Sequence, residues 1–233
     1  MIYILDTETT DSDPKTCEVI ELAYAGFSSL HDILETDAWP SQTSRFWPSR
    51  PMAYGALATH HILLEDLQGC PRSDTAQVPN DCDYLIGHNI DFDWEVLGAP
   101  AQVKRIDTIA MMRDMYPMLD SHKLSACVYF LNGANSHTRA RLQNAHSATA
   151  DVIFCTEILQ HICDENGIKD IESLYTYSEE ARIPKIMSFG KHKGEPVSDV
   201  PYGYIKWYRS QSDTDPYLLE AFRRVTDAQY KGR

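Results

Sequence analysis

Five side chains spread over most of the chain have the types needed for metal-assisted activation of water. They are Asp6, Glu8, Asp93, His146 and Asp151. Four carboxylates that converge without a cation would repel one another strongly, so such a set implies a bound divalent metal. Hard oxygen ligands favour Mg²⁺ or Mn²⁺. A histidine beside such ions is a natural base for deprotonating water.

The first two acids follow an apolar run at the start of the chain. Met1–Leu5 is short and apolar, which predicts a buried strand. Side chains of a strand repeat every second residue, so Asp6 and Glu8 are expected on one face. An acid at the end of a buried strand is costly unless it is paired or metal-bound. Because carboxylates at strand edges are common, this pair alone does not decide between a site and a solvated edge.

The third acid lies after a second apolar run, in the segment His88-Asn89-Ile90-Asp91-Phe92-Asp93. Asn89 can hydrogen-bond local backbone and shape the exit from the strand. Asp91 competes for the metal role because it is two residues away. The spacing from His88 and Asn89 favours Asp93.

The last two residues flank the start of a helical run, His146-Ser-Ala-Thr-Ala-Asp151. Small Ala148 permits close packing near a crowded site. Asp151, in the first turn, lies near the positive end of the helix dipole, which favours its ionised form. His146 precedes the helix and could swing over the metals, although a lone histidine is more often an ordinary surface or core residue.

Charge is distributed unevenly along the 233 residues, which suit one large domain with or without a small appendage. The net charge is −13. Residues 1–181 carry 11 Lys and Arg against 28 Asp and Glu, whereas residues 182–233 carry 10 against 6. The tail is therefore basic and the body acidic. Either the tail charges are merely solvated, or they hold a polyanion.

The six cysteines form no Cys-x-x-Cys pair, and several fall inside apolar runs. They are expected to be buried free thiols in a reducing compartment, which predicts a cytoplasmic protein. No apolar stretch approaches the roughly 20 residues of a membrane span. Asp6 and Glu8 interrupt the first apolar segment, so no signal peptide and no membrane contact are expected.

Hydrophobic patterning predicts alternating strands and helices. Strands are expected at residues 1–5, 19–27, 33–39, 84–87 and 103–106, the first three as a meander. Helices are expected near residue 92 and at 108–115, 123–130 and 148–163. The tail is expected to form a strand and basic turn at 187–194, a hairpin partner at 197–200, and helices at 202–208 and from Pro216.

Taken together, the three acidic segments resemble the DEDDh group of 3′–5′ exonucleases over roughly residues 1–165. Further segments that match the group are Arg50-Pro51, His61-Ile62, Asp107-Thr108 and Ser121-His122-Lys123-Leu124. The resemblance implies an α/β, ribonuclease H-like fold, a five-stranded mixed sheet flanked by helices. It predicts an exonuclease domain at 1–167, a linker at 168–185, and a small basic hairpin-helix module at 186–233.

The resemblance also implies roles for the five residues. Two Mg²⁺ ions, which Mn²⁺ could replace, would be held by the four acids. Asp6 would bridge both ions, Glu8 and Asp151 would complete the nucleophile-side ion, and Asp93 would act mainly through metal-bound water. His146 would be the general base.

Substrate contacts are implied as well. Thr7, Thr10 and Ile62 would hold the terminal nucleotide of DNA, either a single strand or the 3′ end of a duplex. In the basic tail, Lys191 and Lys193 lie between two glycines, where cations and backbone amides could contact phosphate. Trp207 is expected to belong to the small core of the module rather than to stack on bases.

The function expected is a metal-dependent exodeoxyribonuclease in DNA repair or recombination. Three alternatives stay open on the sequence. An RNA-trimming exonuclease would share the catalytic residues, because discrimination between the sugars depends on a few contacts near the 2′ position. A polymerase proofreading subunit would use the tail to bind a polymerase. A non-enzymatic nucleic-acid-binding module is disfavoured because all five positions are present.

Overall fold

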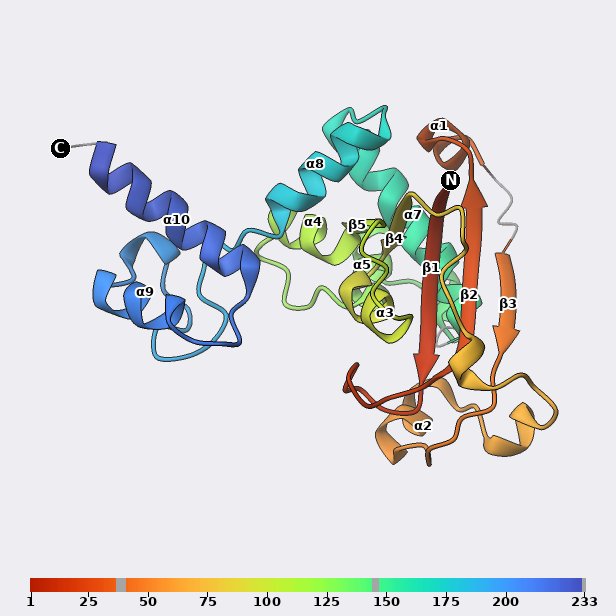
Figure 1. Cartoon of the computed structure of the whole chain (residues 1–233). Helices are drawn as coiled ribbons and strands as arrows, with labels where there is room; N and C mark the ends of the chain where they lie inside the picture. Colours follow the sequence, from red (N-terminus) through yellow and green to blue (C-terminus); the bar gives the residue numbers. More distant parts are fainter. Residues whose placement is uncertain (37–40, 144–146, 232–233) are drawn as a thin grey trace. The chain divides into compact units, whose positions relative to one another are not determined.

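The computed structural model describes residues 1–36, 41–143 and 147–231 (Figure 1). These divide into two compact units, Met1–Ser178 and Glu179–Arg233, called here unit 1 and unit 2. This division falls within the segment predicted as a linker, residues 168–185. Helix α8 (Ile171–Ala181) occupies most of the segment expected as a linker, and its Leu174 and Ser178 are fully buried. This helix was not predicted because its sequence is mostly polar and only a narrow stripe of it is apolar.

Unit 1 is built on the predicted five-stranded mixed sheet. Its strands are β1 (Ile2–Thr9), β2 (Val19–Phe27), β3 (Ser41–Arg45), β4 (Tyr84–Gly87) and β5 (Lys104–Asp107), in the spatial order β3-β2-β1-β4-β5. The first three pair antiparallel, whereas β4 and β5 run parallel to β1. The central place of β1 explains its apolar sequence. Ile4 and Leu5 point to opposite faces and both are almost fully buried, so both faces of the sheet are covered.

Helices cover the sheet and bring distant segments to β1. They are α1 (Leu30–Leu34), α2 (Tyr54–His60), α3 (Ile90–Val96), α4 (Thr108–Met115), α5 (Leu124–Asn132), α6 (Ser136–Leu142) and α7 (Ala148–Asn166). Single 3₁₀ turns form at Leu64–Leu67 and Ser73–Thr75. Helix α7 packs along β1 and β2 (Figure 1) with its apolar stripe buried, as predicted, and ends at Gly167, whose φ is 63°.

The prediction for the third strand was wrong. Residues 30–34 form α1, and the strand lies at Ser41–Arg45. Ser29 caps the helix through the Asp32 amide, and Leu30 and Ile33 bury one side of it. Strand β3 was missed because its sequence, Ser-Gln-Thr-Ser-Arg, is polar and has no apolar alternation, as suits an edge strand. Helix α6 was also missed.

Unit 2 has its own apolar core, formed by Met187, Val197, Val200, Ile205, Tyr208, Leu218, Ala221 and Phe222. The predicted helices are present as α9 (Tyr202–Arg209) and α10 (Pro216–Lys231). The predicted hairpin is reduced to one bridge between Ile186 and Pro196, and Val197–Asp199 forms a 3₁₀ turn instead of a strand. Pro196 lacks an amide hydrogen, so a regular ladder cannot continue through it.

Trp207 does not take the core position expected for it. Its side chain is 52% exposed, and Tyr208 is buried in its place. Successive helical residues are separated by about 100°, so the face that buries Ile205 and Tyr208 turns Trp207 outward. In the part of the chain that the structure describes, no helix has the length and apolar character needed to cross a bilayer.

Candidate active site

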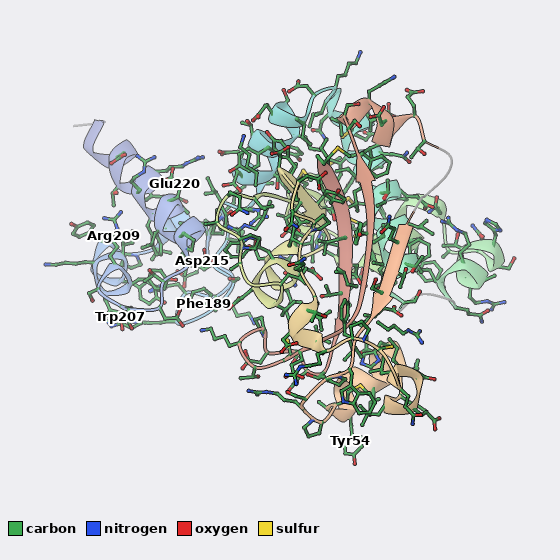
Figure 2. All side chains as sticks on the ribbon, turned by 45° about the vertical axis from the view of Figure 1, so that its right-hand side comes forward. Tyr54, Phe189, Trp207, Arg209, Asp215 and Glu220 are labelled. Carbon is green, nitrogen blue, oxygen red and sulfur yellow. The ribbon has the colours of Figure 1, made fainter. Side chains whose placement is uncertain are left out.

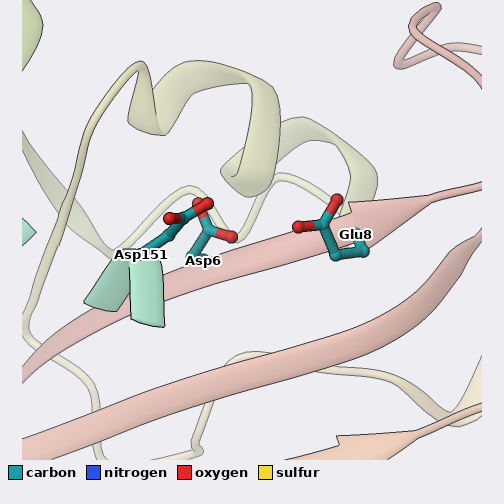
Figure 3. A group of neighbouring side chains, drawn as sticks. All are labelled: Asp6, Glu8 and Asp151. Atoms are coloured by element: carbon teal, nitrogen blue, oxygen red, sulfur yellow. The ribbon is translucent and has the colours of Figure 1, made fainter. Parts of the chain in front are cut away.

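Asp6, Glu8 and Asp151 come together as the sequence predicts. One carboxylate oxygen from each lies within 4.8 Å of the others. Figure 3 shows Asp6 and Glu8 on the same side of β1, with Asp151 reaching Asp6 from the first turn of α7. Glu8 is buried, whereas Asp6 and Asp151 are half-buried. The group of three oxygen donors, called here the acidic cluster, could hold a metal ion.

Asp93 lies beside the acidic cluster and is tied to β1. Its Oδ1 accepts hydrogen bonds from the Thr7 backbone N–H at 2.9 Å and from the Thr7 hydroxyl at 2.7 Å. Because Thr7 lies between Asp6 and Glu8, this contact sets the first turn of α3 against the cluster. Asp91 pairs instead with Arg105. The structure therefore supports Asp93 over Asp91 at this position.

The buried carboxylates of the site repel one another, and a bound cation would stabilise their ionised forms. Burial, followed by repulsion from Asp93 and the other carboxylates, raises the pKa of Asp6 well above its ordinary value. Burial and repulsion from Asp151 raise the pKa of Glu8 to about 8. Burial raises the pKa of Asp93 to about 7, although the hydrogen bonds from Thr7 lower it. A divalent ion would reverse these shifts by favouring the ionised carboxylates, so the donor set fits a metal.

Glu21 on β2 is a further acid of this region that the sequence analysis missed. It is 2% exposed and lies opposite Glu8 in the β1–β2 ladder. Its side chain accepts the Ala148 N–H at 3.0 Å and pairs with Arg45 at 2.9 Å. Glu21 thus holds the N-terminus of α7, the helix that supplies Asp151. The signal in the sequence was a single acid within the apolar run Val19–Phe27.

Two pockets adjoin the acidic residues. The larger, of about 560 Å³, has Glu8 in its wall, with side chains from β1, α2 and α3. Its lining includes Thr7, Thr9, Thr59, His60, Asn89 and Phe92. The smaller, of about 210 Å³, is lined by Asp6, Asp151, Lys123, Ser125 and Phe154 among others. The cluster therefore borders a roomy pocket through Glu8 and a narrower, lysine-containing pocket through Asp6 and Asp151.

His60 contributes a polar group to the larger pocket. Its Nδ1 accepts the Ile62 N–H at 2.9 Å, so the neutral ring carries its proton on Nε2. Burial lowers the His60 pKa, which favours that neutral ring. Among the described residues Nε2 makes no hydrogen bond of good geometry, although the nearby Thr9 backbone opposes the lowering of the His60 pKa. The residue contributes to the pocket wall, whereas its Nε2 atom is buried.

The other predicted site residues fall in different places. Thr7 lines the larger pocket, but Thr10 is 1% exposed and its hydroxyl accepts the Glu18 N–H at 3.0 Å. Ile62 is 5% exposed and packs with Ile20 and Leu67. The structure thus brings neither Thr10 nor Ile62 to the pocket wall. His146 lies outside the described residues.

The two lysines expected to contact phosphate, Lys191 and Lys193, are exposed in unit 2.

His88 hydrogen-bonds Thr108 at 2.9 Å and the His122 carbonyl at 2.7 Å, and burial lowers its pKa to about 4. These contacts give His88 a structural role between α4 and the segment before α5. All six cysteines are free, and four of them are buried.

Comparison with known proteins defines the class of fold. No protein-family model and no curated protein sequence matches the chain. Solved structures do match, and structures of exonucleases X and I are among them. The zinc-bound complex of Escherichia coli exonuclease I with single-stranded DNA matches with a TM-score of 0.56 and 18% identity, over 79% of this chain and 43% of that one. Unit 1 therefore has the ribonuclease H-like fold of these exonucleases, as predicted.

The structure of exonuclease X is matched over almost all of its own length. Its complex with 5′-overhanging duplex DNA matches with a TM-score of 0.57 and 20% identity, over 99% of that chain and 76% of this one. A likeness to exodeoxyribonuclease X is also what the sequence predicts, where the tail segments Ser188–Val200 and Tyr204–Trp207 are expected to resemble a C-terminal module of that enzyme. About a quarter of this chain has no counterpart in the matched structure.

Proposed function

We propose that this chain is a metal-dependent 3′–5′ exodeoxyribonuclease. The observation that carries the proposal is the convergence of Asp6, Glu8 and Asp151, with Asp93 held beside them by Thr7. The pKa values of Asp6, Glu8 and Asp93 are raised, which means that their ionised forms are unfavourable in this arrangement without a cation. Support also comes from the fold, since solved structures with it include DNA complexes of exonucleases X and I.

Two Mg²⁺ ions, replaceable by Mn²⁺, are the cofactors that the oxygen donors favour. Asp6, Glu8, Asp93 and Asp151 would hold them. When bound, the ions would lower the pKa of water and neutralise charge at the scissile phosphate. His146 would accept the proton of the attacking water, since its ordinary pKa is close to neutral.

The larger pocket suits the terminal nucleotide. Phe92 offers a ring against which a base can stack. Asn89 offers amide hydrogens at the same wall, and a sugar or base oxygen would accept from them. Lys123 in the smaller pocket would contact a phosphate of the strand.

The proposed partners are single-stranded DNA and the 3′ ends of duplexes, and the proposed role is in repair or recombination. The catalytic residues do not separate DNA from RNA. Matched DNA and RNA oligonucleotides, labelled at the 5′ end and incubated with and without Mg²⁺, would decide the sugar. Early products shortened by one nucleotide would establish the 3′–5′ polarity.

A pair of variants in α3 tests the assignment. Asp93→Asn should lower the rate of nucleotide release by about 10–100-fold, because the amide keeps an acceptor oxygen for Thr7 but removes the carboxylate charge beside the acidic cluster. Asp91→Asn removes a carboxylate from the same turn and weakens its pair with Arg105, but Asp91 does not belong to the acidic cluster, so activity should be nearly unchanged. Asp6→Ala should abolish cleavage. An active Asp6→Ala enzyme, or equal losses in the two α3 variants, would refute the assignment.

A further inference from the structure

We infer that unit 2 carries a binding surface for single-stranded nucleic acid, separate from the acidic cluster. It consists of Phe189 and Trp207 with Lys191, Lys193 and Lys206, and is called here the aromatic–lysine surface. Unit 2 has a filled core of its own in which Phe222 is fully buried. Phe189 and Trp207 are nevertheless 43% and 52% exposed, so they are available to a ligand.

The turn that carries two of the lysines is held against α9. Gly190 has φ of 73°, and a Cβ there would lie 2.7 Å from the Tyr204 hydroxyl, so only glycine allows this approach. His192 is buried, with its ring 4.7 Å from that of Tyr204. Because His192 faces inward, Lys191 and Lys193 on either side of it are exposed.

The aromatic side chains belong to the same structure. The Tyr204 ring lies 5.2 Å from that of Trp207, and Phe189 lies 6.1 Å from Tyr208. The turn and α9, which pack against each other, therefore carry the exposed lysines and the exposed rings. Figure 2 shows Phe189 and Trp207 toward one side of the unit and Glu220 toward the other. The rings are held by packing against neighbours, so little side-chain entropy is lost when a base stacks on them.

The cations of this surface are not neutralised by the protein. Among the described residues, Lys191, Lys193 and Lys206 form no ion pair. Glu220, a carboxylate of the same unit, pairs with Arg223 and Arg224. At the turn itself, Glu195 accepts from His192 at 2.8 Å. The three lysines and the two exposed rings of the turn and α9 are complementary to a chain of phosphates and bases.

Single-stranded nucleic acid is the occupant that uses both features. Stacking on aromatic rings requires bases that are not already stacked within a duplex, and phosphates provide charge for the lysines. An acidic protein would use the lysines but not the stacking. The inference deepens the proposed function by adding a second contact with the strand, but it does not depend on cleavage.

A covalently closed single-stranded DNA circle tests the inference, because it has no 3′ end to enter the candidate active site. Binding of the fluorescent circle to the full chain would be measured by anisotropy in EDTA over a range of salt concentrations. Trp207→Ala should weaken binding by about 5- to 150-fold, the usual range for one stacked base. Trp207→Tyr should recover most of the affinity. The double variant Lys191→Ala, Lys193→Ala should lower the salt slope by about 1.4.

Arg223→Ala is the matched control, because it removes one positive charge from a residue already paired with Glu220 and Asp227. It should leave binding of the circle unchanged. Failure of the native chain to bind the circle would overturn the inference, as would an equal loss in Arg223→Ala and the lysine variant. Tighter binding to a duplex circle than to the single strand would also exclude it. None of these outcomes bears on the exonuclease proposal, which requires free 3′ ends.

Discussion

At the scale of single residues, Asp6, Glu8 and Asp93 are unfavourable in the folded chain unless something compensates their charge. Folding places them beside one another in a partly dry site, which raises the pKa of each. This destabilisation is typical of a binding site, where local stability is given up for function. It has a measurable consequence in the absence of metal.

Stability of the metal-free protein should fall as pH rises. The pKa values of Glu8 and Asp93 are raised from 4.5 and 3.8 to about 8 and about 7. The folded state therefore binds more protons than the unfolded state between about pH 4 and about pH 8, and stability is lost across that window. Melting temperature in EDTA should decline across it. Mg²⁺ should restore stability at the alkaline end and have little effect at the acidic end. A melting temperature independent of pH in EDTA would contradict the raised pKa values.

His146 provides the second test at this scale. If it is the general base, His146→Ala should lower turnover by roughly 10²–10⁴-fold. The native rate should rise with pH through the titration of the imidazole, and the variant should lose that rise. His161→Ala, which removes a histidine hydrogen-bonded to Tyr116 in unit 1, is a suitable control. A native rate that is flat across neutral pH would argue against His146 as the base.

At the scale of elements, the site depends on how α7 meets the sheet. Helix α7 places Asp151 beside β1. The side chain of Glu21 on β2 accepts a hydrogen bond from the backbone N–H of Ala148, the first residue of α7. Glu21 on β2 thus positions α7, and α7 supplies the Asp151 carboxylate that completes the acidic cluster beside β1. Glu21 is a positioning residue rather than a metal ligand in this arrangement.

Glu21→Ala should therefore destabilise the protein even with Mg²⁺ present. The buried Ala148 N–H would lose its acceptor, which lowers the free energy of unfolding by about 1–3 kcal/mol. Glu21→Gln keeps an acceptor oxygen and should lose less. Denaturant unfolding and Mg²⁺ titration of both variants would measure the effect. Equal stability of the two variants would show that the carboxylate oxygen does not hold α7.

At the scale of the whole molecule, the two units differ in charge and in what they could bind. Residues 1–178 carry 11 Lys and Arg against 26 Asp and Glu, whereas residues 179–233 carry 10 against 8. Net charge therefore does not exclude a nucleic-acid ligand. Binding of a nucleic acid depends on the positive charges near the bound strand rather than on the net charge of the chain. The acidic residues of unit 1 include the carboxylates of the candidate active site, whose charge a bound metal would neutralise.

The division into units predicts two thermal transitions. Mg²⁺ should raise only the transition of unit 1, because a ligand stabilises the part of the protein that binds it. Phe222→Ala should lower only the transition of unit 2, since a buried Phe→Ala change costs about 3–5 kcal/mol. Scanning calorimetry of the full chain would separate them. One cooperative transition that moves as a whole in both experiments would show that the units do not unfold independently.

Local sequence patterns alone predicted much of the secondary structure and part of the candidate active site. Alternation placed Asp6 and Glu8 on one side of β1, and helical spacing gave the buried stripe of α7, because both periods are properties of the backbone. Long-range packing decided the rest. It gave Glu21 its role at α7, placed Ile62 in the core and left Trp207 exposed. Which side chain reaches a site depends on neighbours far away in the sequence, and no local period contains that information.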